Sequence, residues 1–121
     1  MLRGVRGAIT VIENKEADIL KATEKLLNVM IEKNNLSADS VASVFISTTD
    51  DITAVFPARA MRALDGWKYV PVMCMKEMTT PDSINFCIRI MMHINTDKGQ
   101  TEIHHVYLEG ASGLRPDLDS N

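Results

Sequence analysis

Five stretches of the chain are rich in apolar and β-branched residues and are bounded by turn residues, a pattern that predicts β-strands. The expected strands cover residues 5–12, 41–48, 69–75, 86–95 and 103–108. Pro71 places the third of these at a sheet edge or at a strand start, because proline cannot donate to a ladder. We expect the five strands to form one sheet.

Residues 15–33 repeat their apolar positions with the period of a helix. The apolar stripe consists of Ile19, Thr23, Leu26, Leu27, Met30 and Ile31. Asn14 is expected to cap the start of this helix, and Asn34 and Asn35 are expected to end it. The pattern predicts an amphipathic helix that covers one face of the sheet.

The expected strand at residues 86–95 has two different faces, because successive side chains of a strand point to opposite sides. One face carries Phe86, Ile88, Ile90, Met92 and Ile94. The other face carries Cys87, Arg89, Met91 and His93. The first set is expected to pack against the long helix. The second set is mixed and needs a pocket or another subunit to cover it, so the sequence predicts an oligomer.

The expected fold is of the α+β class, a five-stranded sheet covered by one long amphipathic helix plus a short helical turn. Pro57 is expected to open that turn, which covers residues 57–64, and Gly66 to stop it. The chain has 121 residues, of which 45% are hydrophobic and 24% charged. This length and composition fit a single domain over residues 1–121, with a flexible C-terminal tail from about residue 110.

Composition and charge exclude several classes of function. The net charge is −3 and no block of lysine or arginine occurs, which argues against nucleic-acid binding. No apolar run reaches the roughly 18 residues of a membrane span, and the N-terminus lacks the apolar core of a signal peptide. Cys74 and Cys87 are therefore expected to be reduced thiols in a cytoplasmic protein.

Arg89 is the most informative residue, since its permanent charge lies inside the most apolar run of the chain. Desolvating a guanidinium costs several kcal/mol unless an anion or a polar cavity meets it. The partner is either a carboxylate of the protein, such as Glu77, or a ligand. Six arginines stand in apolar or turn settings: Arg3, Arg6, Arg59, Arg62, Arg89 and Arg115. Few carboxylates match them there, so the surplus favours a ligand with more than one acidic group.

Other chemistry is poorly represented. The three histidines show no metal-binding spacing, and the two cysteines form no C-x-x-C pair. No nucleophile–base pair, glycine-rich phosphate loop or cofactor fingerprint is present. Tyr107, taken alone, is expected to be a core residue with its hydroxyl at a rim. We expect neither a metal nor a cofactor.

Seven segments resemble the monofunctional AroH-class chorismate mutases, in order and over nearly the whole chain. They are RGVRGA at residues 3–8, FPARAMR at 56–62, GWKYVPV at 66–72, CMKEM at 74–78, CIRIMM at 87–92, HVYLE at 105–109 and LRPDL at 114–118. The resemblance implies a homotrimer, a pseudo-α/β-barrel with a mixed sheet in each subunit and active sites at the subunit interfaces. It implies the rearrangement of chorismate to prephenate, a step toward phenylalanine and tyrosine, without a cofactor.

The resemblance also assigns site residues. One subunit would supply Arg6, Glu77, Arg89, Tyr107 and Leu114. Its neighbour would supply Phe56, Ala58, Arg59, Arg62, Val72, Met73 and Cys74, and Arg115 would close over the pocket from the tail. Met73 stands where the family commonly has a smaller polar residue, and Arg59 where it often has lysine. Gly110, Ser112 and Gly113 make the approach to the tail more flexible than is usual in the family.

Each implied role matches a need of the chemistry. Arg89 would donate to the ether oxygen, where charge grows as the bond breaks. Arg6 and Tyr107 would hold a carboxylate, while Glu77 would accept from the ring hydroxyl with help from Cys74. The pocket walls would be Phe56, Val72 and Leu114. A pericyclic rearrangement needs no nucleophile, acid or base, in agreement with the absence of such groups.

Two other functions remain open at this point. A trimer of related architecture, like the imine-deaminase-like small proteins, could bind small carboxylates without catalysis. A simple anion binder gains nothing from a carboxylate at Glu77, which favours the mutase. A purely structural oligomerisation domain leaves the arginines without a purpose.

Overall fold

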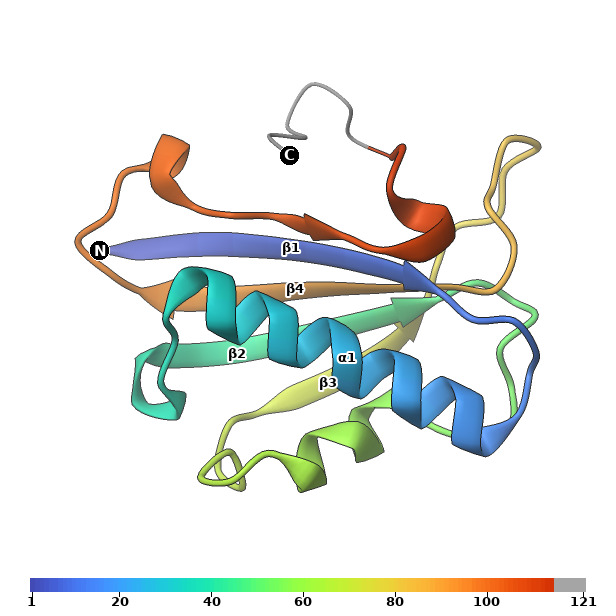
Figure 1. Ribbon diagram of the computed structural model, residues 1–121, viewed down its shortest axis with the longest axis horizontal. Coiled ribbons are helices and arrows are strands. Elements are labelled where there is room, and N and C mark those ends of the chain that lie inside the picture. Colours follow the sequence, from blue (N-terminus) through green and yellow to red (C-terminus); the bar gives the residue numbers. More distant parts are fainter. Residues whose placement is uncertain (115–121) are drawn as a thin grey trace.

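The computed structural model describes residues 1–114, in which five strands form one mixed sheet with a long helix lying across it (Figure 1). The strands are β1 (Leu2–Thr10), β2 (Val41–Thr48), β3 (Val72–Lys76), β4 (Cys87–Asn95) and β5 (Val106–Tyr107). Their order across the sheet is β3-β2-β4-β1-β5. The central strand β4 runs antiparallel to both neighbours, whereas the outer pairs β2–β3 and β1–β5 are parallel. The predicted α+β class and five-stranded sheet are confirmed.

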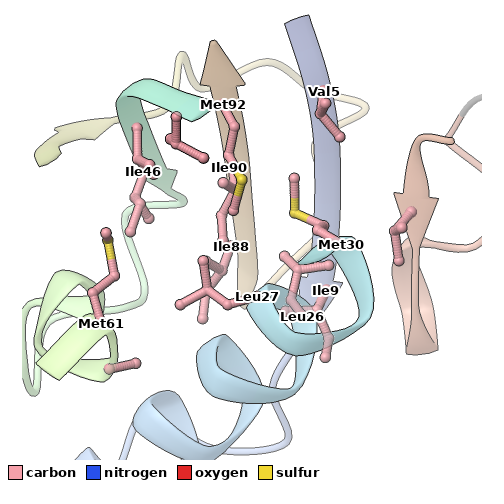
Figure 2. Close-up of a cluster of buried hydrophobic side chains, with 14 of the residues drawn as sticks. Val5, Ile9, Leu26, Leu27, Met30, Ile46, Met61, Ile88, Ile90 and Met92 are labelled. Atoms are coloured by element: carbon pink, nitrogen blue, oxygen red, sulfur yellow. The ribbon is translucent and has the colours of Figure 1, made fainter. Parts of the chain in front are cut away.

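The helix α1 (Glu16–Asn34) buries the stripe that the sequence predicted. Its buried residues are Ile19, Thr23, Leu26, Leu27, Met30 and Asn34. Ile31, which the sequence placed in the stripe, is only half-buried, and Asn34 takes the last buried position. Figure 2 shows Leu26, Leu27 and Met30 among side chains from β1, β2 and β4. The core therefore lies between α1 and one face of the sheet.

The predicted cap of α1 is wrong, because Asn14 bonds to a distant loop instead. Lys15 is the N-cap residue and makes no side-chain capping bond. The Asn14 Oδ1 accepts from the amides of Thr53 and Ala54, at 2.9 and 3.0 Å, and its Nδ2 donates to the Thr53 hydroxyl at 2.8 Å. The side chain thus ties the start of α1 to the loop after β2. The predicted end is confirmed, since Asn35 closes the helix with a left-handed φ of 51°.

Short 3₁₀ turns connect the longer elements. They are η1 (Ala38–Ser40), η2 (Pro57–Ala63), η3 (Gln100–Glu102) and η4 (Glu109–Ala111). The helical turn predicted over residues 57–64 is η2, with 3₁₀ geometry, and its Ala60 and Met61 are buried in the core. None of the helices within residues 1–114 is long and apolar enough to span a bilayer.

Three of the strands differ from the prediction by two residues or more at one or both ends. The strand expected at 5–12 is shifted to Leu2–Thr10. The strand expected at 69–75 begins only at Val72, because Val70 turns back to bond the Trp67 carbonyl at 3.1 Å. Its place at the sheet edge is confirmed. The strand expected at 103–108 shrinks to the two residues of β5.

The two faces of β4 differ as predicted. Ile88, Ile90, Met92 and Ile94 are at most 2% exposed beneath α1. On the opposite face Cys87 is buried, while Arg89, Met91 and His93 are half-buried. We call this second side the open face, because α1 and η2 both pack on the other side of the sheet. Phe86 lies just before the strand with φ of 52°, and its half-buried side chain still packs against the core, as predicted.

A methyl group at Gly7 should destabilise the fold, because this residue lies where α1 crosses β1. A Cβ there would lie 2.5 Å from the Met30 sulfur and 3.1 Å from a Leu26 methyl. We expect Gly7→Ala to lower the free energy of unfolding by about 1–3 kcal/mol, measured by urea denaturation. The control is Gly99→Ala, whose Cβ would meet only Glu102, at an ordinary 3.5 Å. Unchanged stability in Gly7→Ala would mean that α1 moves away at no cost.

Candidate active site

A cavity of about 300 Å³ lies on the open face, near the middle of the sheet. Its lining comes from β1, β2, β4, β5 and the end of β3: Arg6, Gly7, Ala8, Phe45, Ser47, Met75, Glu77, Arg89, Ile90, Met91 and Tyr107. All four strongly polar residues that the sequence predicted for one subunit are therefore brought together: Arg6, Glu77, Arg89 and Tyr107. We call this the open-face cavity.

Strand register explains why these side chains meet. Met75 pairs with Ser47, Ser47 with Arg89, Arg89 with Ala8, and Ala8 with Tyr107. One row of residues thus crosses all five strands, and its side chains all point to the open face. Ala8 is the smallest member of the row and stands between the guanidinium and the phenol. Its short side chain leaves the space that the cavity occupies.

Three donors surround the carboxylate of Glu77. The Ser47 hydroxyl donates to Oε2 at 3.0 Å, and the Met78 amide donates to Oε1 at 3.1 Å. The Arg89 Nε lies 3.3 Å from the same Oε2, an ion-pair contact whose N–H direction does not make a hydrogen bond. Arg89 therefore has an internal carboxylate beside it, yet that carboxylate leaves its Nε donor unused.

Two buried donors face the cavity without a hydrogen-bond partner. They are the Arg89 Nε and the Tyr107 hydroxyl, the only such side-chain atoms within residues 1–114. An unsatisfied buried polar group costs about 1–3 kcal/mol, so native proteins keep few of them. Both residues line one cavity and come from strands on either side of β1. Two free donors at one place point to a ligand that accepts hydrogen bonds.

Cys87 lies on the open face two residues before Arg89 and is only 1% exposed. Burial raises the pKa of its thiol, and the nearby Arg89 guanidinium offsets only part of that rise. The thiol is therefore neutral at neutral pH and does not compensate the charge of Arg89. Together with Arg6, the open-face cavity carries two positive charges against the one negative charge of Glu77.

A second group of predicted residues gathers around η2, at the β3 edge of the sheet. A cavity of about 330 Å³ there is lined by Phe56, Ala58, Arg59, Met61, Arg62, Trp67, Lys68, Val70 and Val72. Three of these residues are basic. Arg59 reaches Glu16 in the first turn of α1, with Nη1 2.6 Å from Oε1. Cys74 lines a neighbouring, larger cavity of about 670 Å³ together with Phe56 and Arg59. We call this region the η2 surface.

The two regions lie on different sides of β3. Val72 and Cys74 pair with Val44 and Ile46 of β2, whose side chains are buried in the core. Met73, between them, points to the open face and is 60% exposed. The open-face cavity and the η2 surface of one chain therefore cannot surround the same small ligand.

The last described residues pack on the open face without lining the open-face cavity. Leu114 and Tyr107 both pack against a small cluster formed by Ala8, Cys87 and Ala111. Arg115, predicted to close the pocket, lies outside the described residues. The segment before it is joined to β1, because the Gly110 amide donates to the Thr10 hydroxyl at 2.9 Å. Within residues 1–114 no cluster of three histidine, cysteine or acidic side chains could hold a metal ion.

Sequence reasoning did not include Ser47, which bonds Glu77 directly. A signal was available in β2. The alternation of its side chains puts Val44 and Ile46 on the core face, and it puts Phe45 and Ser47 on the open face. A serine on the same face as an embedded arginine is a candidate for the site. What the pattern lacked was the pairing of β2 with β4, which sets Ser47 opposite Arg89.

Comparisons with known proteins agree over almost the entire chain. The family model described as "Chorismate mutase type I" matches residues 2–118. A chorismate mutase AroH of Bacillus subtilis is 49% identical, over 98% of this chain and 93% of the relative. The corresponding Thermus thermophilus protein is 43% identical over 99% and 98%. A solved chorismate mutase from Clostridium thermocellum superposes with a TM-score of 0.87 at 47% identity, covering 90% of this chain and 96% of that one.

Cys87 should resist alkylation in the folded protein. Its burial limits access, and its raised pKa lowers the thiolate fraction at every pH below that pKa. We expect iodoacetamide to modify Cys74, which is partly exposed, and to modify Cys87 only after unfolding, as read by intact mass. The matched variant Cys74→Ser should take up no label when folded. Rapid labelling of that folded variant would contradict the burial of Cys87.

Proposed function

The chain belongs to the type I chorismate mutases, isomerases that convert chorismate to prephenate, and we propose that the open-face cavity performs this rearrangement by positioning and charge stabilisation. The observation that carries the proposed mechanism is the pair of unpaired buried donors, Arg89 Nε and Tyr107 Oη, beside Arg6 in one cavity. Chorismate has two carboxylates and an ether oxygen. These oxygens are acceptors for the donors of Arg6, Arg89 and Tyr107 in the cavity.

Arg89 acts on the reacting bond. In the rearrangement a C–O bond breaks while a C–C bond forms within the same molecule, so no proton has to be transferred. Negative charge grows on the ether oxygen as its bond lengthens. A fixed donor aimed at such an oxygen is typically worth roughly 3–4 kcal/mol of barrier. The Arg89 Nε has no competing hydrogen bond to break, because its contact with Glu77 lacks that geometry.

The other cavity residues orient the substrate. Arg6 and the Tyr107 hydroxyl hold a carboxylate, and Glu77 accepts from the ring hydroxyl. Ser47 and the Met78 amide fix the Glu77 carboxylate so that one of its oxygens faces the cavity. Holding a flexible substrate in its compact reactive shape removes an entropic part of the barrier.

The second half of the site comes from a neighbouring subunit in a homotrimer with a pseudo-α/β-barrel arrangement. Two observations support this assembly. The open face of the sheet carries exposed Met73 and Met75, 60% and 43% exposed, and within residues 1–114 only the short turn η4 packs on it, through Ala111 against Ala8 and Cys87. The η2 surface supplies Arg59 and Arg62, yet it cannot reach the open-face cavity of its own chain.

In this arrangement the η2 surface of one subunit faces the open-face cavity of the next. Phe56, Ala58 and Val72 provide apolar walls, Met73 and Cys74 border the substrate from β3, and Arg59 and Arg62 add positive charge. Leu114 and Arg115 cover the pocket from the C-terminal segment. A cytoplasmic location stays a prediction, with which the two free thiols Cys74 and Cys87 agree.

Removing Arg89 should abolish most of the catalysis. We expect wild-type protein to consume chorismate without added metal or cofactor, followed by absorbance, and Arg89→Ala to lower kcat by about two to three decades. Arg89→Lys keeps the charge but not the Nε donor, so its kcat should lie between the two. Circular dichroism and native mass serve as fold controls. No turnover by wild-type protein, or a loss of less than tenfold in folded Arg89→Ala, would refute this mechanism.

Mixing two inactive variants tests whether sites are shared. Arg89→Ala damages the open-face cavity, and Arg62→Ala damages the η2 surface. In randomly mixed trimers about one quarter of the interface sites combine an intact half from each variant, so activity should reappear after co-refolding. Each variant refolded alone is the control. No recovery in mixtures that native mass spectrometry shows to be hybrid trimers would mean that each site lies within one chain.

A further inference from the structure

The strand β5 is held to β1 by an incomplete parallel ladder. In such a ladder the N–H and C=O of one residue bond to the residues before and after its partner. The ladder follows this rule at Ala8. Ala8 pairs with Tyr107, and the Ala8 carbonyl accepts from the Leu108 amide at 2.9 Å. Two residues earlier in β1, the same rule assigns the Arg6 amide to the carbonyl of His104.

The His104 backbone is already occupied by the end of α1. The Asn34 Nδ2 donates to the His104 carbonyl at 2.8 Å, and the Asn34 Oδ1 accepts from the His104 amide at 2.8 Å. Asn34 is only 4% exposed, so its side of this two-bond clamp is shielded from water. The clamp explains why β5 begins at Val106, two residues later. It also leaves the Arg6 amide without its ladder acceptor.

The imidazole of His105 takes the place of that acceptor. The Arg6 amide donates to the His105 Nδ1 at 3.0 Å. A backbone N–H is always a donor, so Nδ1 must carry a lone pair and the ring must be neutral with its proton on Nε2. A side chain thus provides one rung of the sheet at the residue whose guanidinium lines the open-face cavity.

We propose that His105 is a positioning residue for the rearrangement, which sets the backbone of Arg6 and through it the grip on the substrate carboxylate. The inference rests on the proposed function, because it assigns Arg6 to that carboxylate. The side chains of Arg6 and Ala8 point to the same face of β1, and Ala8 pairs with Tyr107. The rung at Arg6 and the ladder at Ala8 together hold β1 and β5 in register at the cavity.

A neutral hydrogen bond of this kind has a modest value, and its loss should act mainly on binding. Arg6 contacts the carboxylate in the ground state and in the transition state alike, so a displaced Arg6 raises KM more than it lowers kcat. We expect His105→Ala to raise the KM for chorismate roughly 3- to 10-fold with a smaller change in kcat. His105→Asn should restore KM to within about twofold, since its amide oxygen can accept from the same N–H.

The control is His104→Ala. His104 is exposed, and both of its hydrogen bonds to Asn34 go through the backbone, so KM should stay at the wild-type value. A wild-type KM in His105→Ala, or an equal loss in His105→Ala and His105→Asn, would overturn the proposal. The second outcome would mean that the ring only fills space.

Nitrogen NMR of the wild-type protein tests the bond without turnover. We expect the His105 Nδ1 to give the resonance of an unprotonated ring nitrogen, and the Arg6 amide to be protected from hydrogen exchange. The protection should be lost in His105→Ala and kept in His105→Asn. If His105→Ala does not fold, the proposal is decided by the wild-type spectrum together with the KM and the Arg6 amide protection of His105→Asn. A protonated Nδ1 would overturn the inference, whereas an intact bond in a protein that leaves chorismate unchanged would refute the proposed function alone.

Discussion

Burial of one face of β4 is the constraint on which the rest of the structure depends. Four of its side chains, Ile88, Ile90, Met92 and Ile94, are almost fully removed from water under α1. A strand alternates its side chains strictly, so this burial forces Arg89 to the opposite face. A shift of register by one residue would place the guanidinium in the core at a cost of several kcal/mol. Burial of the apolar face of β4 therefore also fixes the side of the sheet to which Arg89 points.

The same constraint shapes the open face, which holds the cavity that we propose as the binding site. Antiparallel pairing on both sides of β4 brings Ser47 and Ala8 next to Arg89, and parallel pairing adds Met75 and Tyr107 to the row. In this row the Arg89 Nε and the Tyr107 hydroxyl have no hydrogen-bond partner, and the small Ala8 stands between them. Glu77 balances part of the charge without using the Arg89 Nε. Such preorganised donors match a reaction that develops charge but transfers no proton.

Several local expectations were corrected because tertiary contacts outweighed local preference. Asn14 has the side chain of an N-cap, yet the amides of Thr53 and Ala54 offer it two bonds that local capping does not. The strand expected over residues 103–108 was shortened because Asn34 takes both backbone groups of His104. In both cases a polar side chain found partners far away in the sequence, which no local pattern can indicate.

The sequence by itself determined the elements, the buried face of each and the presence of an arginine that needs an anion, because side-chain periodicity and desolvation act locally along the chain. Its likeness to a known family predicted the residues that we propose for the site. Only the tertiary structure decided which residues meet: Ser47 with Glu77, and His105 with Arg6. It also placed the open-face cavity and the η2 surface on different sides of β3. Strand order and register decide these pairings, and they depend on contacts between residues far apart in the chain.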